Sequence, residues 1–192
     1  SRWQFGSKGG AEALQAAIAF VGSGMAEYAL AIGADTNQTH RGDGPEYTTG
    51  CGGSAWLIGD ARKSLAVLEG SFSYTVDTCH LWRRKAGGCR TGTIRESVHS
   101  AYFENTIVAV EKLMSSLRTR PGDYTYAVFH QPDLKSPRRV AKELGFTYEQ
   151  VDAGLLVGVV GNAGAASSLL GLSAVLDIAN PGDRVLLASF DA

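Results

Sequence analysis

Short apolar runs alternate with helix-like segments along this chain, and the alternation restricts the folds that it can adopt. The runs that indicate strands are 28–36, which is expected to be buried, 52–60, 64–75, 124–132 and, after a turn, 181–190. Helical spacing or composition extends over 8–21, 101–120, 136–146 and 167–179. Residues 77–97 lack a clear period and are predicted to form a long loop. Strands that alternate with helices predict an α/β fold.

The composition excludes two broad classes of function. Of the 192 residues, 44% are hydrophobic and 19% are charged, and the net charge of −1 provides no basic field for nucleic acid. No apolar run reaches the roughly 18 residues of a membrane span. The three cysteines form no CxxC pair or His/Cys cluster, so neither a disulfide scaffold nor a zinc site is predicted. We expect no metal and a cytoplasmic location.

The patterns at both ends of the sequence predict that other polypeptide segments pack against them. Helical spacing begins within ten residues of Ser1, and the final VLLASFDA indicates a buried strand. A buried strand at a terminus leaves backbone groups unpaired unless another segment completes the sheet. We therefore expect further polypeptide at these edges.

Ser7 lies in the small-residue turn FGSKGG, directly before the first helical segment. Its hydroxyl would lie near free backbone N–H groups and the positive end of the helix dipole, where an anion or polarised carbonyl is stabilised. Serine is also a common helix N-cap, so a purely structural role is the alternative.

His130 follows a short apolar run at the C-terminal end of a predicted strand, and Pro132 then interrupts the ladder. Open α/β sheets place their sites at this end. An imidazole there can transfer a proton near neutral pH or donate a hydrogen bond to a thioester oxygen. A structural histidine at a strand end is the alternative.

Asn162 stands between the apolar stretch GLLVGVVG and a helix start made of small residues. Its side-chain amide could donate a hydrogen bond to an oxyanion. Asn-Ala-Gly is also an ordinary turn or helix cap, so the position alone does not define a site.

Several separate segments, in collinear order, resemble the thiolase superfamily and within it the archaeal-type hydroxymethylglutaryl-CoA synthases. They are YALAIGADTNQ…GDGPEYTTGCGGSAWLIG, VDTCHLWRR, FHQPD…K…AKELGF and GLLVGVVGNAGAASSLLGLSAVLDIANPGDRVLLASF, within the range from Phe5 to Phe190. The resemblance implies a layered αβαβα fold, incomplete in this chain. Residues 1–69 would be the remainder of the first thiolase-type half, 70–100 an excursion, and 101–192 the second half, truncated at its C-terminal end.

For activity, the resemblance implies a Claisen condensation of acetyl-CoA with acetoacetyl-CoA to 3-hydroxy-3-methylglutaryl-CoA, a step of the mevalonate pathway. In the family a cysteine takes up the acetyl group, a glutamate removes a methyl proton, and the carbanion attacks the ketone before hydrolysis. Ser7 matches the cysteine position, while His130 and Asn162 match the residues that hold thioester and ketone oxygens. Coenzyme A thioesters would be substrates, with no permanently bound cofactor.

Serine in place of cysteine is the departure that most affects this expectation. A thiol has a pKa of about 8.5 that a helix N-terminus can lower, whereas a serine hydroxyl needs an adjacent base. Cys51 is interpreted as a packed small residue at a strand start, and Cys79 and Cys89 lie in the excursion, so none is expected to replace the nucleophile. A non-catalytic partner subunit of a thiolase-type complex and a serine-dependent acyltransferase with His130 as base are the alternatives.

Two further departures accompany the serine. The family's glutamate precedes the nucleophile, in sequence that would lie before Ser1. Residues 163–166 (Ala-Gly-Ala-Ala) lack the hydroxyl side chains that the family usually has there. Altered specificity, a degenerate subunit and a cysteine replaced to trap a substrate are all compatible with these losses.

Two basic clusters could meet the phosphates of coenzyme A, although charges that flank a helix start are usually only solvated. They are Arg83, Arg84 and Lys85, and Lys135, Arg138 and Arg139. For assembly we expect a homodimer, or a hetero-oligomer with thiolase-type or accessory subunits, and neither nucleic acid nor membrane as a partner.

Overall fold

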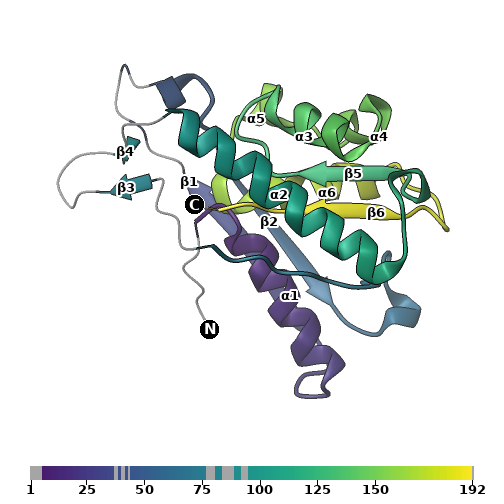
Figure 1. The fold of residues 1–192 in the computed structure, drawn as a ribbon. Helices are drawn as coiled ribbons and strands as arrows, with labels where there is room; N and C mark the ends of the chain where they lie inside the picture. The colour runs from purple at the N-terminus through teal and green to yellow at the C-terminus, as the bar shows by residue number, and fades with distance from the viewer. Residues whose placement is uncertain are drawn as a thin grey trace.

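The computed structural model describes residues 6–36, 39, 42, 44–76, 81–83, 89–91 and 95–191, and it confirms an α/β arrangement (Figure 1). The helices are α1 (Gly9–Gly22), α2 (Arg95–Leu117), α3 (Ser136–Leu144), α4 (Tyr148–Asp152), α5 (Val157–Val160) and α6 (Ser167–Leu176). The strands are β1 (Ala29–Thr36), β2 (Cys51–Ile58), β3 (Leu81–Arg83), β4 (Cys89–Thr91), β5 (Tyr126–Phe129) and β6 (Val185–Ala188). None of these helices is long and apolar enough to cross a membrane.

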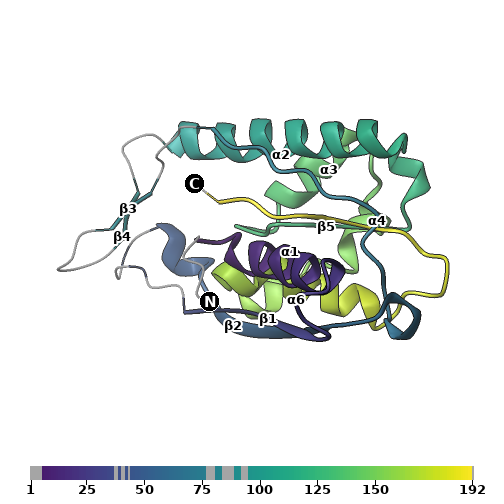
Figure 2. The same cartoon turned by 90° about the horizontal axis from the view of Figure 1, so that it is seen from below.

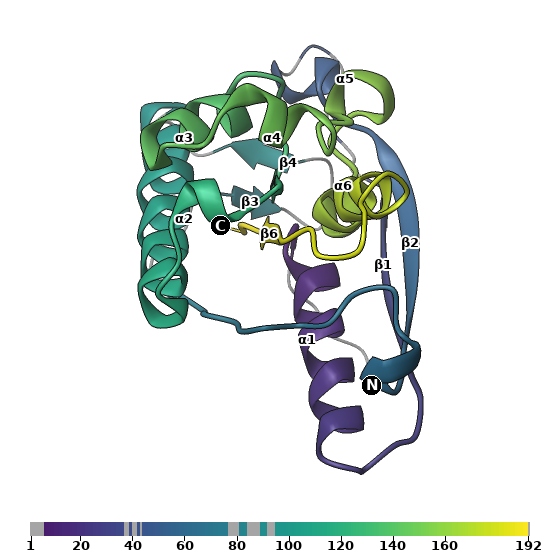
Figure 3. The same cartoon turned by 90° about the vertical axis from the view of Figure 1, so that its right-hand side faces the viewer.

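Helices and sheets alternate as layers. Figure 2 shows α2 and α3 on one side of the β5–β6 sheet and α1 and α6 on its other side, followed by the β1–β2 sheet. In Figure 3, α1 and α6 lie between β6 and the β1–β2 pair. The two central helices therefore lie in the layer between the two sheets.

The β5–β6 sheet is parallel, with Tyr126 opposite Val185 and Phe129 opposite Ala188. Helices cover both of its faces, and a near-continuous apolar strand is typical of a sheet buried in this way. Its side chains join one hydrophobic cluster with residues of α2, α3 and α4. The buried members are Tyr102, Val110, Met114, Tyr124, Ala127, Phe129, Val140, Ala141, Leu144, Phe146, Val151 and Leu186.

The β1–β2 sheet is an antiparallel pair with one covered face. Its register runs from Ala29 opposite Ile58 to Thr36 opposite Cys51. Exposure alternates along both strands, as the period of two requires, so that Leu30 and Leu57 form an opposed pair on the uncovered face. The strands predicted over 28–36 and 52–60 are confirmed to within two residues.

The strand predicted over 64–75 is wrong, because this segment is extended but has no strand as a partner among the described residues. Its polar anchors are side-chain contacts: Gln15 Nε2 donates to Ser71 Oγ at 2.9 Å, and Glu69 pairs with Arg184 at 2.9 Å. Within the predicted loop 77–97, the short β3–β4 pair forms and α2 already begins at Arg95. Alternating apolar and polar residues, as in 64–75, favour an extended backbone, but a strand also needs a neighbouring strand with which to pair.

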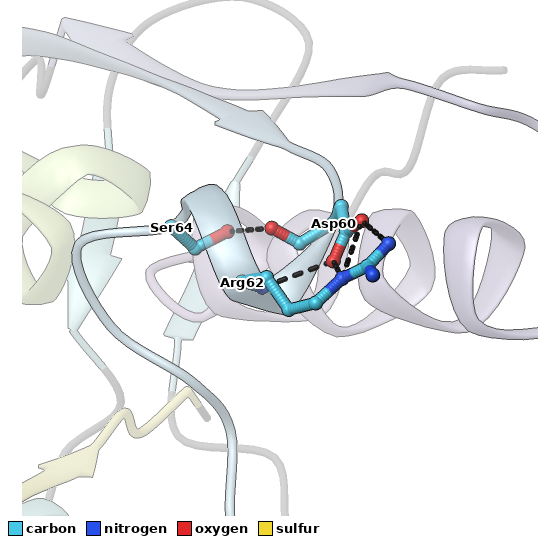
Figure 4. Close-up of polar contacts among 3 residues, drawn as sticks. All are labelled: Asp60, Arg62 and Ser64. Carbon is cyan, nitrogen blue, oxygen red and sulfur yellow. Dashed lines mark hydrogen bonds and ion pairs between the residues drawn. The ribbon is translucent and has the colours of Figure 1, made fainter.

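A local polar cluster ends β2 and turns the chain into this extended segment (Figure 4). The Asp60 carboxylate accepts hydrogen bonds from the Arg62 backbone N–H at 3.0 Å and from Arg62 Nη2 at 2.6 Å. These bonds lower the pKa of Asp60. Ser64 Oγ donates to the Asp60 carbonyl at 2.9 Å. All these partners lie within five residues, so the cluster is explained as a turn.

Candidate functional site

The start of α1 and the ends of β5 and β6 meet at one edge of the molecule. The backbone N–H groups of Gly6 and Ser7 donate to the Asp191 carboxylate at 2.6 and 3.0 Å. Asp191 follows β6 by three residues, and the His130 N–H donates to the carbonyl of Ala188, the last residue of β6, at 2.8 Å. The turn that carries Ser7 and the residue after β5 are therefore both bonded to the chain that leaves β6.

The segment after Asn162 packs against the same end of α1. A side chain at Gly10, in the first turn of α1, would collide with the carbonyl oxygen of Ala165. The Ala165 N–H donates to Asp35 Oδ2 at 3.3 Å, which ties this segment to the end of β1. Larger residues at 163 and 166 would displace their neighbours, since Ala163 and Ala166 are fully buried. The small residues noted in the sequence therefore have a packing role.

Ser7 is not the helix cap. Lys8 occupies the N-cap position of α1, and no side chain caps the helix. The interpretation of Ser7 as an N-cap is therefore wrong, because the helix begins at Gly9, one residue later than a Ser7 cap requires, and the N–H of Ser7 is bonded to Asp191. Lys8 itself forms an ion pair with Glu12, one turn further along, at 3.2 Å.

His130 lies directly after β5, as predicted, and is buried. Burial lowers the pKa of His130 to about 4, so the imidazole is neutral at pH 7. Its Nδ1 has no hydrogen-bond partner among the described residues, whereas the Tyr102 hydroxyl donates to the His130 carbonyl oxygen at 2.6 Å. The backbone of His130 is thus fixed, while the side chain keeps a polar atom for which the described protein offers no partner.

Asn162 is held by its own backbone in a short bridge to the segment before β2. Its N–H donates to the Thr48 carbonyl at 2.6 Å, and its carbonyl accepts from Gly50 at 3.0 Å. The side-chain Oδ1 accepts the Gly164 N–H at 3.1 Å, which closes a local turn and orients the amide group. The interpretation of Asn162 as a turn residue therefore holds for its side-chain oxygen. The amide nitrogen takes no part in this turn.

Gln131 is a buried residue of this region that the sequence did not single out. Its Nε2 donates to the Gly154 carbonyl at 2.5 Å, and its Oε1 accepts from the N–H groups of Leu156 and Val157 at 2.7 and 2.9 Å. These bonds fix the residue after His130 against the start of α5, which leads to Asn162. The only signal in the sequence was an amide beside the histidine at a strand end.

Cys51 does not pack as a small core residue. It is exposed at the start of β2, so that interpretation is wrong: the register of the β1–β2 pair turns its side chain to the uncovered face. Cys89 begins β4, and Cys79 lies outside the described residues. No group of three or more His, Cys, Asp or Glu side chains suited to a metal occurs in the described part of the chain.

The basic residues near α3 have partners within the protein. Arg138 forms an ion pair with Asp152 at 2.9 Å, and the guanidinium of Arg139 lies 4.4 Å from the centre of the Phe103 ring. Lys135 is exposed. Arg83 is in β3, and Arg84 and Lys85 lie outside the described residues. Contact of either cluster with coenzyme A stays a prediction, as does the convergence of the side chains of Ser7, His130 and Asn162 on one point.

Comparison with known proteins gives consistent matches. The family model for the C-terminal part of 3-oxoacyl-[acyl-carrier-protein] synthase III matches residues 114–192. A hydroxymethylglutaryl-CoA synthase of Pyrococcus furiosus is 51% identical over 189 residues, which cover 98% of this chain and 54% of the relative. One of Methanopyrus kandleri is 47% identical over 194 residues, with 98% and 53% covered. The chain thus spans about half the length of these curated relatives.

Solved structures extend the same comparison to the fold. The β-ketoacyl-[acyl carrier protein] synthase III of Thermus thermophilus superposes with a TM-score of 0.82 at 25% identity, over 97% of this chain and 62% of that one. MvaS in complex with 3-hydroxy-3-methylglutaryl coenzyme A superposes with a TM-score of 0.78 at 20% identity, over 91% and 51%. The layered arrangement described above is therefore shared with these enzymes.

Proposed function

Because this chain belongs to the thiolase superfamily, we propose that it takes part in acyl-CoA condensation of the hydroxymethylglutaryl-CoA synthase type. The observation that carries the proposal is the shared edge: the start of α1 and the residue after β5 are both bonded to the chain that leaves β6. Ser7 and His130 are the residues of this edge whose chemistry suits acyl transfer, and Asn162 is proposed to join them, since the segment that follows it packs against the start of α1.

Residue 7 has the acyl-accepting role in the proposed site. Its oxygen attacks the carbonyl of acetyl-CoA, a new ester bond forms, the carbon–sulfur bond breaks, and the thiol of coenzyme A leaves with the hydroxyl proton. The acetyl methyl group must then lose a proton to a base, its carbanion adds to the ketone of acetoacetyl-CoA, and the resulting alkoxide takes the proton back from the base to become a hydroxyl. Hydrolysis with one water molecule releases the condensed product and regenerates the hydroxyl.

His130 serves in this scheme as a neutral hydrogen-bond donor. An imidazole with a pKa of about 4 carries one N–H at neutral pH and can donate it to a thioester or ketone oxygen. The same value makes His130 a weak base at pH 7, because general bases work best with a pKa near the working pH. A serine-dependent acyltransferase that relies on His130 to activate Ser7 is accordingly the less favoured alternative.

Asn162 would supply the second donor. Its Oδ1 is held by the Gly164 N–H at 3.1 Å, which sets the direction of the side-chain amide. A pre-oriented amide can stabilise the negative charge that develops on an oxygen during condensation, without further reorganisation.

A non-catalytic partner subunit is the second candidate, and one observation favours it. A carboxylate, Asp191, is bonded to the backbone N–H of Ser7, the group that would otherwise stabilise charge at this position. A serine ester also acidifies the acetyl methyl group less than a thioester does. A chain with these two features could retain the fold and the contacts of the family without its turnover.

Acetyl transfer to residue 7 tests the proposal. The chain with Ser7 and its Ser7→Cys variant are incubated with acetyl-CoA and digested, and the peptide that carries residue 7 is weighed by mass spectrometry. We expect an added acetyl group on this peptide in the Ser7→Cys variant and a much slower gain in the chain with Ser7, since little alkoxide exists near neutral pH. Asn162→Ala in the Ser7→Cys background should slow acetylation.

Each other outcome has a clear meaning. Equal rates for the chain with Ser7 and for the Ser7→Cys variant would favour a serine-dependent transferase. Absence of acetylation in both, with circular dichroism and thermal unfolding unchanged, would favour the partner subunit and reject condensation by this chain.

A further inference from the structure

The Asp191 side chain binds two backbone N–H groups in the turn directly before α1. Its two carboxylate oxygens accept from Gly6 at 2.6 Å and from Ser7 at 3.0 Å, across 185 and 184 residues of sequence. Glycine at position 6 is required for this contact, because a Cβ there would collide with the carboxylate. The contact therefore depends on two residues: a glycine at position 6 and a carboxylate at position 191.

These two N–H groups belong to the turn directly before the N-cap of α1, and one of them is the N–H of residue 7 itself. The N-terminal end of a helix stabilises a thiolate, and N–H groups beside a nucleophile stabilise the oxygen of an acyl intermediate. A carboxylate that already accepts from both groups removes these donors. It also places a negative charge beside residue 7, and a like charge within about 4–6 Å raises the pKa of an acid by roughly 1–3 units.

Among the described residues, the charged groups near this turn include one ion pair and a second carboxylate, and the histidine there is neutral. On α1, the ammonium of Lys8 is paired with Glu12 at 3.2 Å. On β1, the Asp35 carboxylate accepts from Ala165 and contributes a second negative charge at this end of the helix. After β5, His130 is neutral at pH 7, since burial lowers its pKa to about 4.

We propose that Asp191 is the residue that adapts this site to a serine, an inference that rests on the proposed function only in taking residue 7 as the nucleophile position. The Asp191 carboxylate raises the fraction of a thiol at position 7 that stays protonated near neutral pH, whereas a neutral hydroxyl tolerates the carboxylate beside it. Cysteine restored alone therefore gives a thiol that still reacts, but more slowly than it would without this charge. Cysteine at position 7 together with a neutral residue at position 191 gives a more reactive thiol.

Thiol reactivity tests this directly and needs no enzymatic activity. The full 192-residue chain is prepared as Ser7→Cys, Ser7→Cys with Asp191→Asn, and Ser7→Cys with Asp177→Asn. Asp177 is an exposed carboxylate at the far end of α6, so its variant controls for the loss of one charge. Alkylation by iodoacetamide is followed from about pH 6 to about pH 10 by mass spectrometry of the peptide that carries residue 7, which separates the introduced thiol from the other cysteines.

Asp191→Asn is expected to raise the alkylation rate of the introduced thiol at pH 7 about tenfold or more and to lower the midpoint of its pH profile by at least about one unit. Asp177→Asn should leave both unchanged. The contact itself is checked by NMR in the chain with Ser7, where the Gly6 and Ser7 amide protons should shift as Asp191 becomes protonated, and should stop doing so in Asp191→Asn.

Equal alkylation rates with and without Asp191→Asn, while the two amides still report the carboxylate, would overturn the proposal. Amides that do not respond to Asp191 would overturn it as well. A tenfold rise in alkylation without any acetylation by acetyl-CoA would support the role of Asp191 and would count against condensation by this chain, so the two proposals fail separately.

Discussion

The two larger sheets of this molecule differ in burial: helices cover both faces of the β5–β6 sheet but only one face of the β1–β2 sheet. Residues 95–191 wrap β5 and β6 in helices on both faces and supply every buried member of the main hydrophobic cluster. Residues 6–76 place α1 on one face of β1 and β2 and leave the other face open. Phe129 of β5 is 1% exposed, whereas Leu57 of β2 is 71% exposed.

The contrast separates a region that is held by its own core from one that is only half covered. On the open face of the β1–β2 sheet, Leu30 opposes Leu57 and Ile32 opposes Ala55, so the apolar residues lie together. A contiguous apolar face of this kind marks an interaction surface or an association risk. Yet the proposed site needs both regions, because Ser7 belongs to the half-covered one and His130 to the self-contained one.

Truncation of a buried side chain should show the largest difference in stability between the two regions. Phe129→Ala removes a buried aromatic ring that packs against Phe146 and is expected to lower the free energy of unfolding by about 3–5 kcal/mol. Leu57→Ala, on the open face, should change it by no more than about 0.5 kcal/mol. Urea unfolding followed by circular dichroism measures both. Similar losses for the two variants would mean that the open face is covered in the isolated chain.

Lowering the pH should reduce the free energy of unfolding through His130, a residue of the self-contained region. The pKa of His130 falls from 6.5 to about 4 on folding, so the unfolded chain binds the extra proton between these values. The stabilisation is complete above pH 6.5 and is lost as the pH falls towards 4, by a total of about 3 kcal/mol.

His130→Gln, which does not titrate, isolates this effect from the carboxylates. Unfolding by urea is measured at several pH values, and the chain with His130 should lose more stability between pH 6.5 and 4 than the variant does. Parallel curves for the two proteins would contradict a buried neutral imidazole at this position.

The ion pair between Glu69 and Arg184 links the two regions and should matter least. Both side chains are partly exposed, and such pairs contribute about 0–1 kcal/mol. Glu69→Gln is therefore expected to lower the free energy of unfolding by less than about 1 kcal/mol, and less at high salt. Glu111→Gln, on the exposed side of α2, is the matched control. A larger loss would show that the extended segment 64–76 is a structural tie rather than a surface contact.

The sequence predicted the elements that short-range patterns determine. The strand positions of β1, β2, β5 and β6 and the helix stop before Pro121 are confirmed, whereas the expected full burial of 28–36 is wrong, because one face of the β1–β2 sheet is uncovered. The segment 64–75 was not, because its alternation favours an extended backbone whether or not a strand is available to pair with it. The start of α2 at Arg95 was not predicted, because residues 95–100 contain a single apolar residue, Val98, and give no apolar period.

The candidate site was predictable in its parts but not in its contacts. His130 at a strand end follows from AVFH, and the position of Asn162 follows from the small residues after it. The bond between Ser7 and Asp191 joins positions 184 residues apart, and no local pattern reports it. The interpretation of Ser7 as a cap was wrong for a local reason, because the helix begins one residue later, with Lys8 at the N-cap.

One measurement tests most directly whether the two regions share a site. In the Ser7→Cys chain, a methylthio group is attached to the introduced thiol with a small reagent, and the side-chain NMR signals of His130, Asn162 and Asn180 are recorded before and after. Asn180, exposed after α6, is the matched control for Asn162. We predict clear shifts for His130 and Asn162 and none for Asn180. Shifts for His130 and Asn162 no larger than that of Asn180 would contradict a common site.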